Sequence, residues 1–105
     1  MAQFDVHRNR TAARSGIPYL VIVQSQRFDA SARRVIAPLL PADKLPSTEP
    51  SLTPKFAIEG RDVVLNPLQL ASVPTDQLGE KVCSLVDDSD RIVAAIDLLI
   101  SRAWG

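Results

Sequence analysis

The stretch KFAIEGRDVVL, residues 55–65, decides the fold that the sequence predicts. It contains two runs of alternating apolar and polar residues, 55–58 and 61–65, with only Glu59 and Gly60 between them. Glycine adopts a positive φ without steric cost, as a two-residue hairpin turn requires. The stretch therefore predicts a β-hairpin, and a hairpin joins antiparallel strands.

The carboxy-terminal stretch 87–105 has the period of a helix. Its apolar residues recur at intervals of three and four, at Ile92, Ala95, Ile96, Leu99, Ile100 and Ala103. This spacing is typical of a helix that lies on a core. Asp87 or Asp88 can cap the helix, and Asp90 adds a favourable negative charge to its first turn.

The rest of the chain predicts short strands and loops. Apolar or alternating runs predict extended segments at 3–8, 19–24, 33–40 and 66–74. The run 19–24, YLVIVQ, is rich in β-branched residues and predicts a strand buried on both faces. Segment 9–18 predicts a mobile loop, and the proline-rich segment 41–54 predicts an irregular surface arm.

About five or six strands followed by one helix predict an α+β fold rather than alternating β–α units. A small curled antiparallel sheet or partly open barrel with one packed helix fits a chain of 105 residues. A chain of this length also predicts a single domain over residues 1–105.

The charges exclude some functions and suggest others. Lys+Arg and Asp+Glu both number 12, so the net charge of zero gives no reason to expect direct binding to nucleic acid. No apolar run is long enough to span a membrane. Arginines are frequent in residues 1–40 and carboxylates in 76–97, which indicates two solvated faces or a bipolar surface for partners. We expect a cytoplasmic protein, because Cys83 has no disulfide partner and no signal peptide is evident.

The residues alone indicate few candidates for catalysis or for metal or cofactor binding. His7 is the only histidine and has no metal-ligand spacing around it, so we expect a plain surface or edge residue. Cys83 lies among apolar residues and indicates a small core residue. No catalytic triad, glycine-rich phosphate loop, metal site or cofactor motif can be assembled. These observations favour a binding module and predict that the chain is not an enzyme.

Trp104 is the only tryptophan and is the second-to-last residue. Tryptophan is usually well buried, whereas chain ends are usually solvated. The ring either folds back onto the strands as an apolar plug or is offered to a partner, and both alternatives remain open on the residues alone.

An ordered set of strings resembles the CcdB family, the toxin half of plasmid and chromosomal toxin–antitoxin pairs. The strings, which cover nearly the whole chain, are QFDVHRNR, VIVQSQRFD, RRVIAPL, LQLASVP, LGEKV, IVAAIDLLI and a terminal Trp-Gly. The resemblance implies an SH3-like barrel with a carboxy-terminal helix, a homodimer, and poisoning of DNA gyrase through its A subunit. It also implies neutralisation by a cognate CcdA-like antitoxin, with no cofactor.

The resemblance also implies functional residues. A Trp from each protomer is expected near the dimer axis, where two rings can clamp an Arg side chain of gyrase. Positions that match the family's gyrase contacts are Trp104, Gly105, Asp97, Phe4, Arg27 and Phe28. An acidic antitoxin tail is expected to dock on Arg8, Arg10 and Arg14.

The chain departs from the family pattern at several of these positions. Trp104 comes about three residues later than in the matching poisons, which in a helix moves the ring by ~4.5 Å and turns it by about 60°. Asp97 replaces an amide and Arg27 replaces an aliphatic residue. Two alternatives therefore stay open: a ribonuclease toxin of the MazF/Kid type, and a non-toxic chromosomal homologue that retains antitoxin binding.

Overall fold

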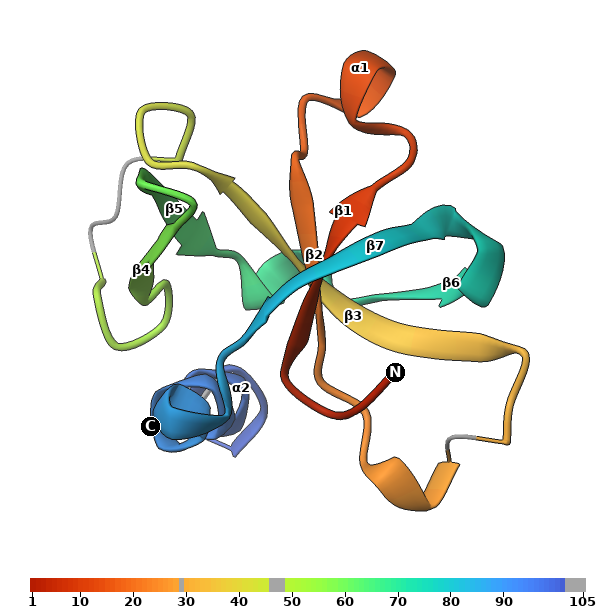
Figure 1. The fold of residues 1–105 in the computed structure, drawn as a ribbon. Coiled ribbons are helices and arrows are strands. Elements are labelled where there is room, and N and C mark those ends of the chain that lie inside the picture. The colour runs from red at the N-terminus through yellow and green to blue at the C-terminus, as the bar shows by residue number, and fades with distance from the viewer. Residues whose placement is uncertain (29, 46–48, 102–105) are drawn as a thin grey trace.

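The computed structural model describes residues 1–28, 30–45 and 49–101. Its strands are β1 (Asp5–Asn9), β2 (Tyr19–Ile22), β3 (Arg33–Pro41), β4 (Lys55–Ile58), β5 (Arg61–Leu65), β6 (Ala71–Pro74) and β7 (Leu78–Ser84). They form one curled sheet in the order β4-β5-β3-β2-β1-β7, and β6 pairs separately with β3 (Figure 1). Every pairing is antiparallel. The α+β prediction of a small SH3-like half-barrel with one carboxy-terminal helix is confirmed.

The predicted hairpin is β4–β5. Ile58 pairs with Arg61, which leaves Glu59 and Gly60 as a two-residue turn. Their φ angles are 52° and 77°, and positive φ at both central positions is the signature of a type I′ turn.

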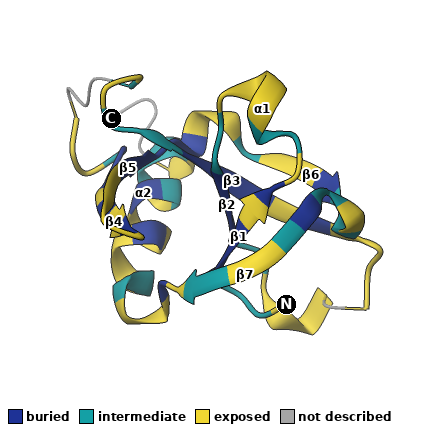
Figure 2. Ribbon diagram, turned by 45° about the horizontal axis from the view of Figure 1, so that its top comes forward, coloured by how far each residue is buried: buried dark blue, intermediate teal, exposed yellow. Residues whose placement is uncertain are grey.

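The strand β2 is buried on both faces, as YLVIVQ predicted. Tyr19 and Val21 belong to one hydrophobic cluster, whereas Leu20 and Ile22 belong to a second cluster on the opposite face. Alternate side chains of a strand point to opposite faces, so β2 serves both clusters. Figure 2 shows this burial as the dark blue centre of the sheet.

The helix α2 (Ser89–Ser101) covers the first cluster beside the β4–β5 hairpin (Figure 1). Ile92 and Ala95 are fully buried, and Ile96 packs against the cluster. The predicted stripe fails at Ile100, which is 68% exposed. Leu99 of the same stripe is half-buried, and Ala103 lies outside the described residues.

Two segments differ from the predictions. Segment 9–18, which was predicted to be a loop, contains a short helix, α1 (Ala12–Ser15), which Gly16 ends at φ 75° with its N–H bonded to the Ala12 carbonyl oxygen. The segment 66–74 is divided by a 3-10 turn, η2 (Pro67–Gln69), because the Asn66 side chain accepts a hydrogen bond from the Leu68 N–H. The other 3-10 turns are η1 (Gln26–Phe28), η3 (Thr75–Gln77) and η4 (Val86–Asp88).

Strand β7 had no specific prediction. Its pairing with β1 shifts register on both sides of His7, and its burial does not alternate cleanly. Among the residues that the structure describes, no helix is long and apolar enough to cross a membrane.

Candidate functional site

Two adjacent hollows lie beside α2, and we call them together the α2 groove. The first has a volume of about 540 Å³ and is lined by Val23, Gln24, Ser25, Phe28, Ser31, Val35, Leu70 and Ile96. The second, of about 310 Å³, is lined by Val23, Val93, Ile96, Asp97, Ile100 and Ser101. Val23 and Ile96 line both, so the two hollows are adjacent along the helix.

The groove exposes several large apolar side chains. Phe28 is 57% exposed, Val93 53% and Ile100 68%. Single exposed apolar residues are ordinary on a protein surface, but a contiguous group in a hollow marks an interaction site. The sheet provides one wall through Val23 and Val35, and α2 provides the other.

Phe28 is positioned by the side chain of Gln24. The Gln24 amide nitrogen donates to the Phe28 carbonyl oxygen at 3.0 Å, and its oxygen accepts from the Val35 N–H at 3.0 Å. One glutamine thus holds the η1 turn against β3 with both ends of its amide.

Two predicted gyrase contacts lie on the groove itself, and a third is next to it. Phe28 lines its first hollow and Asp97 its second. The Arg27 guanidinium lies 5.8 Å from the Phe28 ring centroid. The Asp97 carboxylate accepts from the Ser101 hydroxyl at 2.6 Å.

The other predicted contacts are placed differently. Phe4 is only 8% exposed and belongs to the first hydrophobic cluster beneath the groove. Its φ is 70°, and its N–H donates to the Ile22 carbonyl oxygen at 2.6 Å. Trp104 and Gly105 lie outside the described residues.

The three arginines predicted to bind the antitoxin do not act as a group. Arg10 and Arg14 line a shallow hollow of about 220 Å³ beside α1, together with Thr11 and Ala13. The Arg10 Nε also donates to the Leu78 carbonyl oxygen at 3.3 Å. Arg8, in contrast, is engaged by Glu59 in the β4–β5 turn and by Glu80 on β7.

Arg8 forms a clasp with Glu59, Glu80 and Tyr19. Its two terminal nitrogens donate to the Glu59 carboxylate at 2.9 and 2.7 Å, and its Nε donates to Glu80 at 2.6 Å. The Tyr19 hydroxyl donates to Glu59 at 2.7 Å. These four residues lie far apart in sequence, so no linear motif could have revealed the clasp.

The clasp changes the acidity of its members. Hydrogen bonds from Arg8 and then Tyr19 hold the pKa of Glu59 below its usual value. The two glutamates raise the pKa of Arg8. Burial, followed by the hydrogen bond to Glu59, raises the pKa of Tyr19. The group is thus fixed as a guanidinium, a carboxylate and a neutral phenol at neutral pH.

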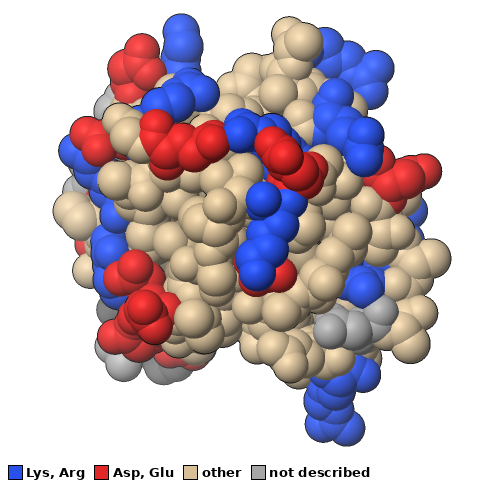
Figure 3. Space-filling model, in the orientation of Figure 1, with Lys and Arg blue, Asp and Glu red and all other residues tan. Residues whose placement is uncertain are grey.

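Positive charge does not form a continuous surface on the face seen in Figure 3, where acidic and basic side chains are mixed. Acidic side chains gather near α2, at the lower left of the same view. No group of three or more His, Cys, Asp and Glu within 1–28, 30–45 and 49–101 is arranged to hold a metal ion.

His7 and Cys83 correct two predictions. His7 is 5% exposed and lies between β2 and β7, so the prediction of a surface or edge histidine is wrong. Its Nδ1 donates to the Gly79 carbonyl oxygen at 2.9 Å and spans the irregular pairing of β1 with β7. Cys83 is only half-buried at the rim of the first cluster, and burial raises the pKa of its thiol.

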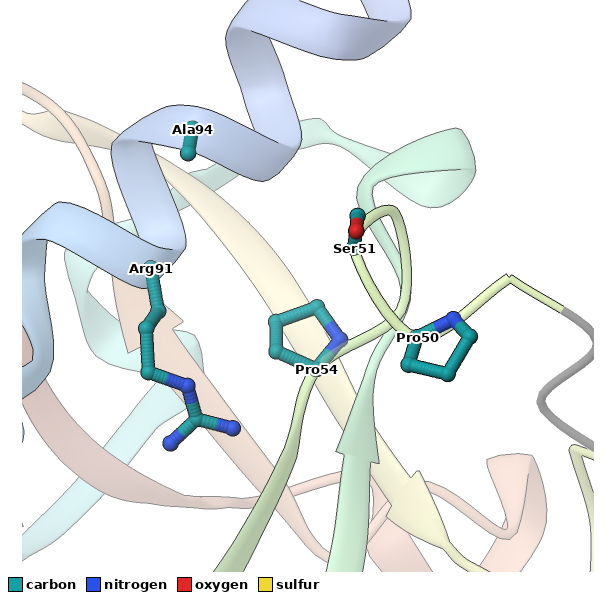
Figure 4. A pocket seen from close by; sticks show the side chains of 5 residues that line it. All are labelled: Pro50, Ser51, Pro54, Arg91 and Ala94. Atoms are coloured by element: carbon teal, nitrogen blue, oxygen red, sulfur yellow. The ribbon is translucent and has the colours of Figure 1, made fainter.

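A further hollow of about 370 Å³ lies on the other side of α2, where Pro50, Ser51 and Pro54 face Arg91 and Ala94 (Figure 4). The Arg91 side chain already has partners within the chain at this hollow. Its guanidinium lies 4.5 Å from the Phe56 ring centroid and donates to the Lys55 carbonyl oxygen at 2.8 Å. This hollow is therefore explained by the packing of α2 on the hairpin.

Two solved structures are similar to the chain over its full length. One is an endoribonuclease from Mycobacterial species, with a TM-score of 0.74 and 16% identity, and the match covers 100% of this chain and 95% of that one. The other is an endoribonuclease in complex with its cognate antitoxin, also from Mycobacterial species, with the same TM-score and identity and coverage of 100% and 99%. At this identity, the likeness shows the fold.

These neighbours overturn the prediction that the chain is not an enzyme, because both are endoribonucleases on this fold. That prediction rested on the lack of a linear catalytic motif. An arginine and two carboxylates nevertheless meet in space at Arg8, Glu59 and Glu80, through the pairing of distant strands.

No curated protein matches the chain significantly. The family model described as CcdB protein matches residues 3–101. This match spans almost the whole chain and agrees with the resemblance carried by the ordered strings. The chain therefore belongs to the CcdB family of toxins from toxin–antitoxin systems.

Proposed function

We propose that the chain, as one domain over residues 1–105, is a toxin that binds and poisons DNA gyrase through its A subunit. The observation that carries the proposal is the α2 groove, of which Phe28 lines the first hollow and Asp97 the adjacent second hollow. Both residues match positions that the family uses for gyrase. Trp104 follows Ser101, which lines the groove, by only two intervening residues.

In this proposal, gyrase is held by two kinds of contact. The apolar wall of the groove excludes water from a gyrase segment, and Asp97 attracts a basic side chain on that segment. Trp104 and Gly105 complete the contact, with the indole face against a gyrase guanidinium, which is a favourable arrangement for an Arg and an aromatic ring. Two copies of the chain would present two such rings, so we propose a homodimer.

The test is trapping of cleaved DNA by gyrase from the host of this chain. We expect the purified full-length protein to accumulate the cleaved-DNA complex, and Trp104→Ala and Asp97→Lys each to reduce it at least tenfold. Asp43→Lys, which makes the same charge change at an exposed loop residue, is the control. Failure of the wild-type protein to trap cleaved DNA would refute gyrase poisoning.

We also propose neutralisation by a cognate antitoxin with an acidic tail. Arg10 and Arg14 flank a hollow beside α1 that can receive a carboxylate-bearing peptide. Arg8 is the weaker candidate of the three, since Glu59 and Glu80 already occupy its guanidinium. Coexpression of the antitoxin should restore growth, and Arg10→Glu with Arg14→Glu should weaken the complex. If the wild-type chain binds the antitoxin but does not impair growth when it is expressed alone, it is instead the non-toxic homologue.

Endoribonuclease activity is the second candidate function, supported by the fold of the two neighbours and by the Arg8 clasp. RNA cleavage needs a carboxylate to take the 2′-hydroxyl proton, a cation for the phosphate, and a proton for the departing 5′-oxygen. We assign the first step to Glu59 and the phosphate contact to Arg8: the 2′-oxygen bonds to phosphorus to form a cyclic phosphate, the phosphorus–5′-oxygen bond breaks, and a water molecule gives the departing 5′-oxygen its proton. RNA should be cut by the wild type and left intact by Glu59→Gln, and uncut RNA with the wild type would remove this candidate.

A further inference from the structure

The clasp around Arg8 leaves one edge of the guanidinium only half occupied. Arginine carries five N–H donors in a planar fork, and Glu59 and Glu80 accept three of them. Glu59 accepts from Nη1 and Nη2 together, at the tip of the fork. Glu80 accepts from Nε alone, at 2.6 Å. Because the guanidinium is planar, the second N–H of Nη2 lies beside Nε on the same edge, and a group with two acceptor oxygens can use both.

The two glutamates of the clasp are held differently. Glu59 accepts from both terminal nitrogens of Arg8 and also from the Tyr19 hydroxyl at 2.7 Å, and it lies in the tight β4–β5 turn. The Glu80 side chain is 70% exposed, and its bond to Arg8 is its only side-chain hydrogen bond among the described residues. Ion pairs between exposed side chains contribute little net free energy. Glu80 is therefore the partner that a ligand can displace, while Glu59 stays in place.

A β-bulge in β7 brings Glu80 to the guanidinium. Between two regular pairs of β1 and β7, Gly79 and Glu80 together oppose the single residue Arg8. An extra residue of this kind redirects a side chain, and bulges are frequent next to active sites. The approach is close, since a Cβ added at Gly79 would lie 3.0 Å from the Arg8 carbonyl oxygen. The bulge thus accounts for a carboxylate of β7 that reaches Arg8.

Loss of the Glu80 contact would change the charge balance of this surface. After the hydrogen bonds from Arg8 and Tyr19, the positive charge of Arg61 also lowers the pKa of Glu59, so Arg61 acts on the clasp. With Glu80 in place, the two arginines face two carboxylates. Without it, they face Glu59 alone, and the net positive charge that results favours an anion.

We propose that the Nε edge of Arg8 is a binding position for a backbone phosphate of RNA, and that Glu80 occupies this position until the phosphate displaces it. Two phosphate oxygens accept from Nε and Nη2, which is the bidentate geometry that suits arginine and phosphate. The inference rests on endoribonuclease activity, the second candidate function, for the identity of the ligand. It adds Glu80 as a residue that competes with the substrate and lowers the affinity for it.

The first experiment uses the full-length protein with inorganic phosphate, at an ionic strength matched by sodium chloride. Nuclear magnetic resonance follows the signal of the Arg8 Nε–H. We expect phosphate to shift this signal. Glu80→Gln keeps the size of the side chain and removes its charge, so it should bind phosphate about fivefold more tightly, which is the size of an exposed ion pair. The matched control Glu49→Gln, at an exposed position elsewhere, should bind phosphate as the wild type does.

A second experiment identifies the source of the phosphate. One probe is a short 2′-O-methyl RNA, which cannot be cleaved because its 2′-oxygens are blocked, and the other is a glutamate-rich peptide of the same charge. We expect the RNA to shift the Arg8 signal at a lower concentration than the peptide. On cleavable RNA, Glu80→Gln should lower KM about fivefold and leave kcat unchanged, because Glu80 competes with the substrate and takes no part in the bond changes.

Several outcomes would overturn the inference. Equal phosphate affinity of the wild type and Glu80→Gln would do so, as would equal tightening in Glu49→Gln, because net charge would then explain it. Stronger binding of the peptide would refute RNA as the ligand. Phosphate and RNA binding in the expected order without RNA cleavage would remove the endoribonuclease candidate and leave the phosphate position standing. Cleavage of RNA with a KM that Glu80→Gln leaves unchanged would do the opposite.

Discussion

At the residue scale, close approach of the backbone makes Gly79 sensitive to substitution. A Cβ added there would lie 3.0 Å from the Arg8 carbonyl oxygen and 3.2 Å from the Arg8 Cβ. The Gly79 carbonyl oxygen also accepts the only hydrogen bond of the buried His7 ring among the described residues. We expect Gly79→Ala to lower the free energy of unfolding by about 1–3 kcal/mol.

Urea denaturation followed by circular dichroism measures this effect. The control is Asp76→Ala, an exposed position just before the same strand, which should change stability by no more than about 0.5 kcal/mol. Equal stability of the two variants would show that β7 can move away from β1 at no cost.

Glu59 makes stability depend on pH. Its pKa is lowered from the usual 4.5 by Arg8 and Tyr19, so its carboxylate stabilises the folded state above that value. This contribution disappears as the pH falls through the lowered pKa, because the protonated form loses its attraction to Arg8. We expect Glu59→Gln to be less stable than the wild type at neutral pH and the difference to shrink towards pH 3.

Urea midpoints at a series of pH values test this, with Asp76→Asn as a control that removes an exposed carboxylate elsewhere. Added salt at neutral pH should also reduce the difference, since the cluster is largely exposed and therefore screened. A difference that grows on acidification would contradict the assignment.

At the element scale, the two faces of α2 have separate roles. Ile92 is fully buried under the helix, whereas Ile100 is 68% exposed in the groove. Ile92→Ala should therefore cost about 2–5 kcal/mol of stability. Ile100→Ser should leave the thermal midpoint nearly unchanged and reduce gyrase trapping several-fold. A large loss of stability in Ile100→Ser would place that side chain in the core instead.

The elements also show what the sequence could reveal. The β4–β5 hairpin and α2 were predictable because local chemistry decides them: Gly60 supplies the turn and the period of three and four defines the helix. Strand β7 was not predictable, because its residues, LGEKVCS, do not alternate between buried and exposed. Its pairing with β1 shifts register on both sides of His7, which accounts for this irregularity. The α1 turn was hidden because its residues, AARS, bury no apolar side chain.

The candidate site was predictable only in part, for a related reason. Family resemblance pointed to Phe28 and Asp97, which the fold brings to one groove. Val35 and Leu70 also line the groove. From the alternation of apolar and polar residues alone, both would be predicted to lie in the core. Arg8 looked like a free cation in sequence, and only the pairing of β1 with β7 and the nearby hairpin turn shows that it is engaged.

At the scale of the whole molecule, the Arg8 clasp joins the two ends of the curled sheet. The sheet order begins with β4 and ends with β7. Arg8 reaches from β1 to Glu59 in the β4–β5 turn and to Glu80 on β7. In the strand order of the described residues, β4 and β7 are not neighbours. The side chain of Arg8 therefore links two ends of the sheet that backbone pairing leaves apart.

Removal of this connection should loosen both ends together. We expect Arg8→Met to raise the rate of amide hydrogen exchange in the β4–β5 hairpin and in β7 at the same time, because each loses its link to the other. The control is Lys55→Met, which removes an ion pair between Lys55 and Asp62 within the hairpin alone. Exchange should then rise in the hairpin and stay unchanged in β7. If Arg8→Met affected only β1, where Arg8 resides, the clasp would be a local surface contact, and the hydrophobic clusters alone would hold the half-barrel closed.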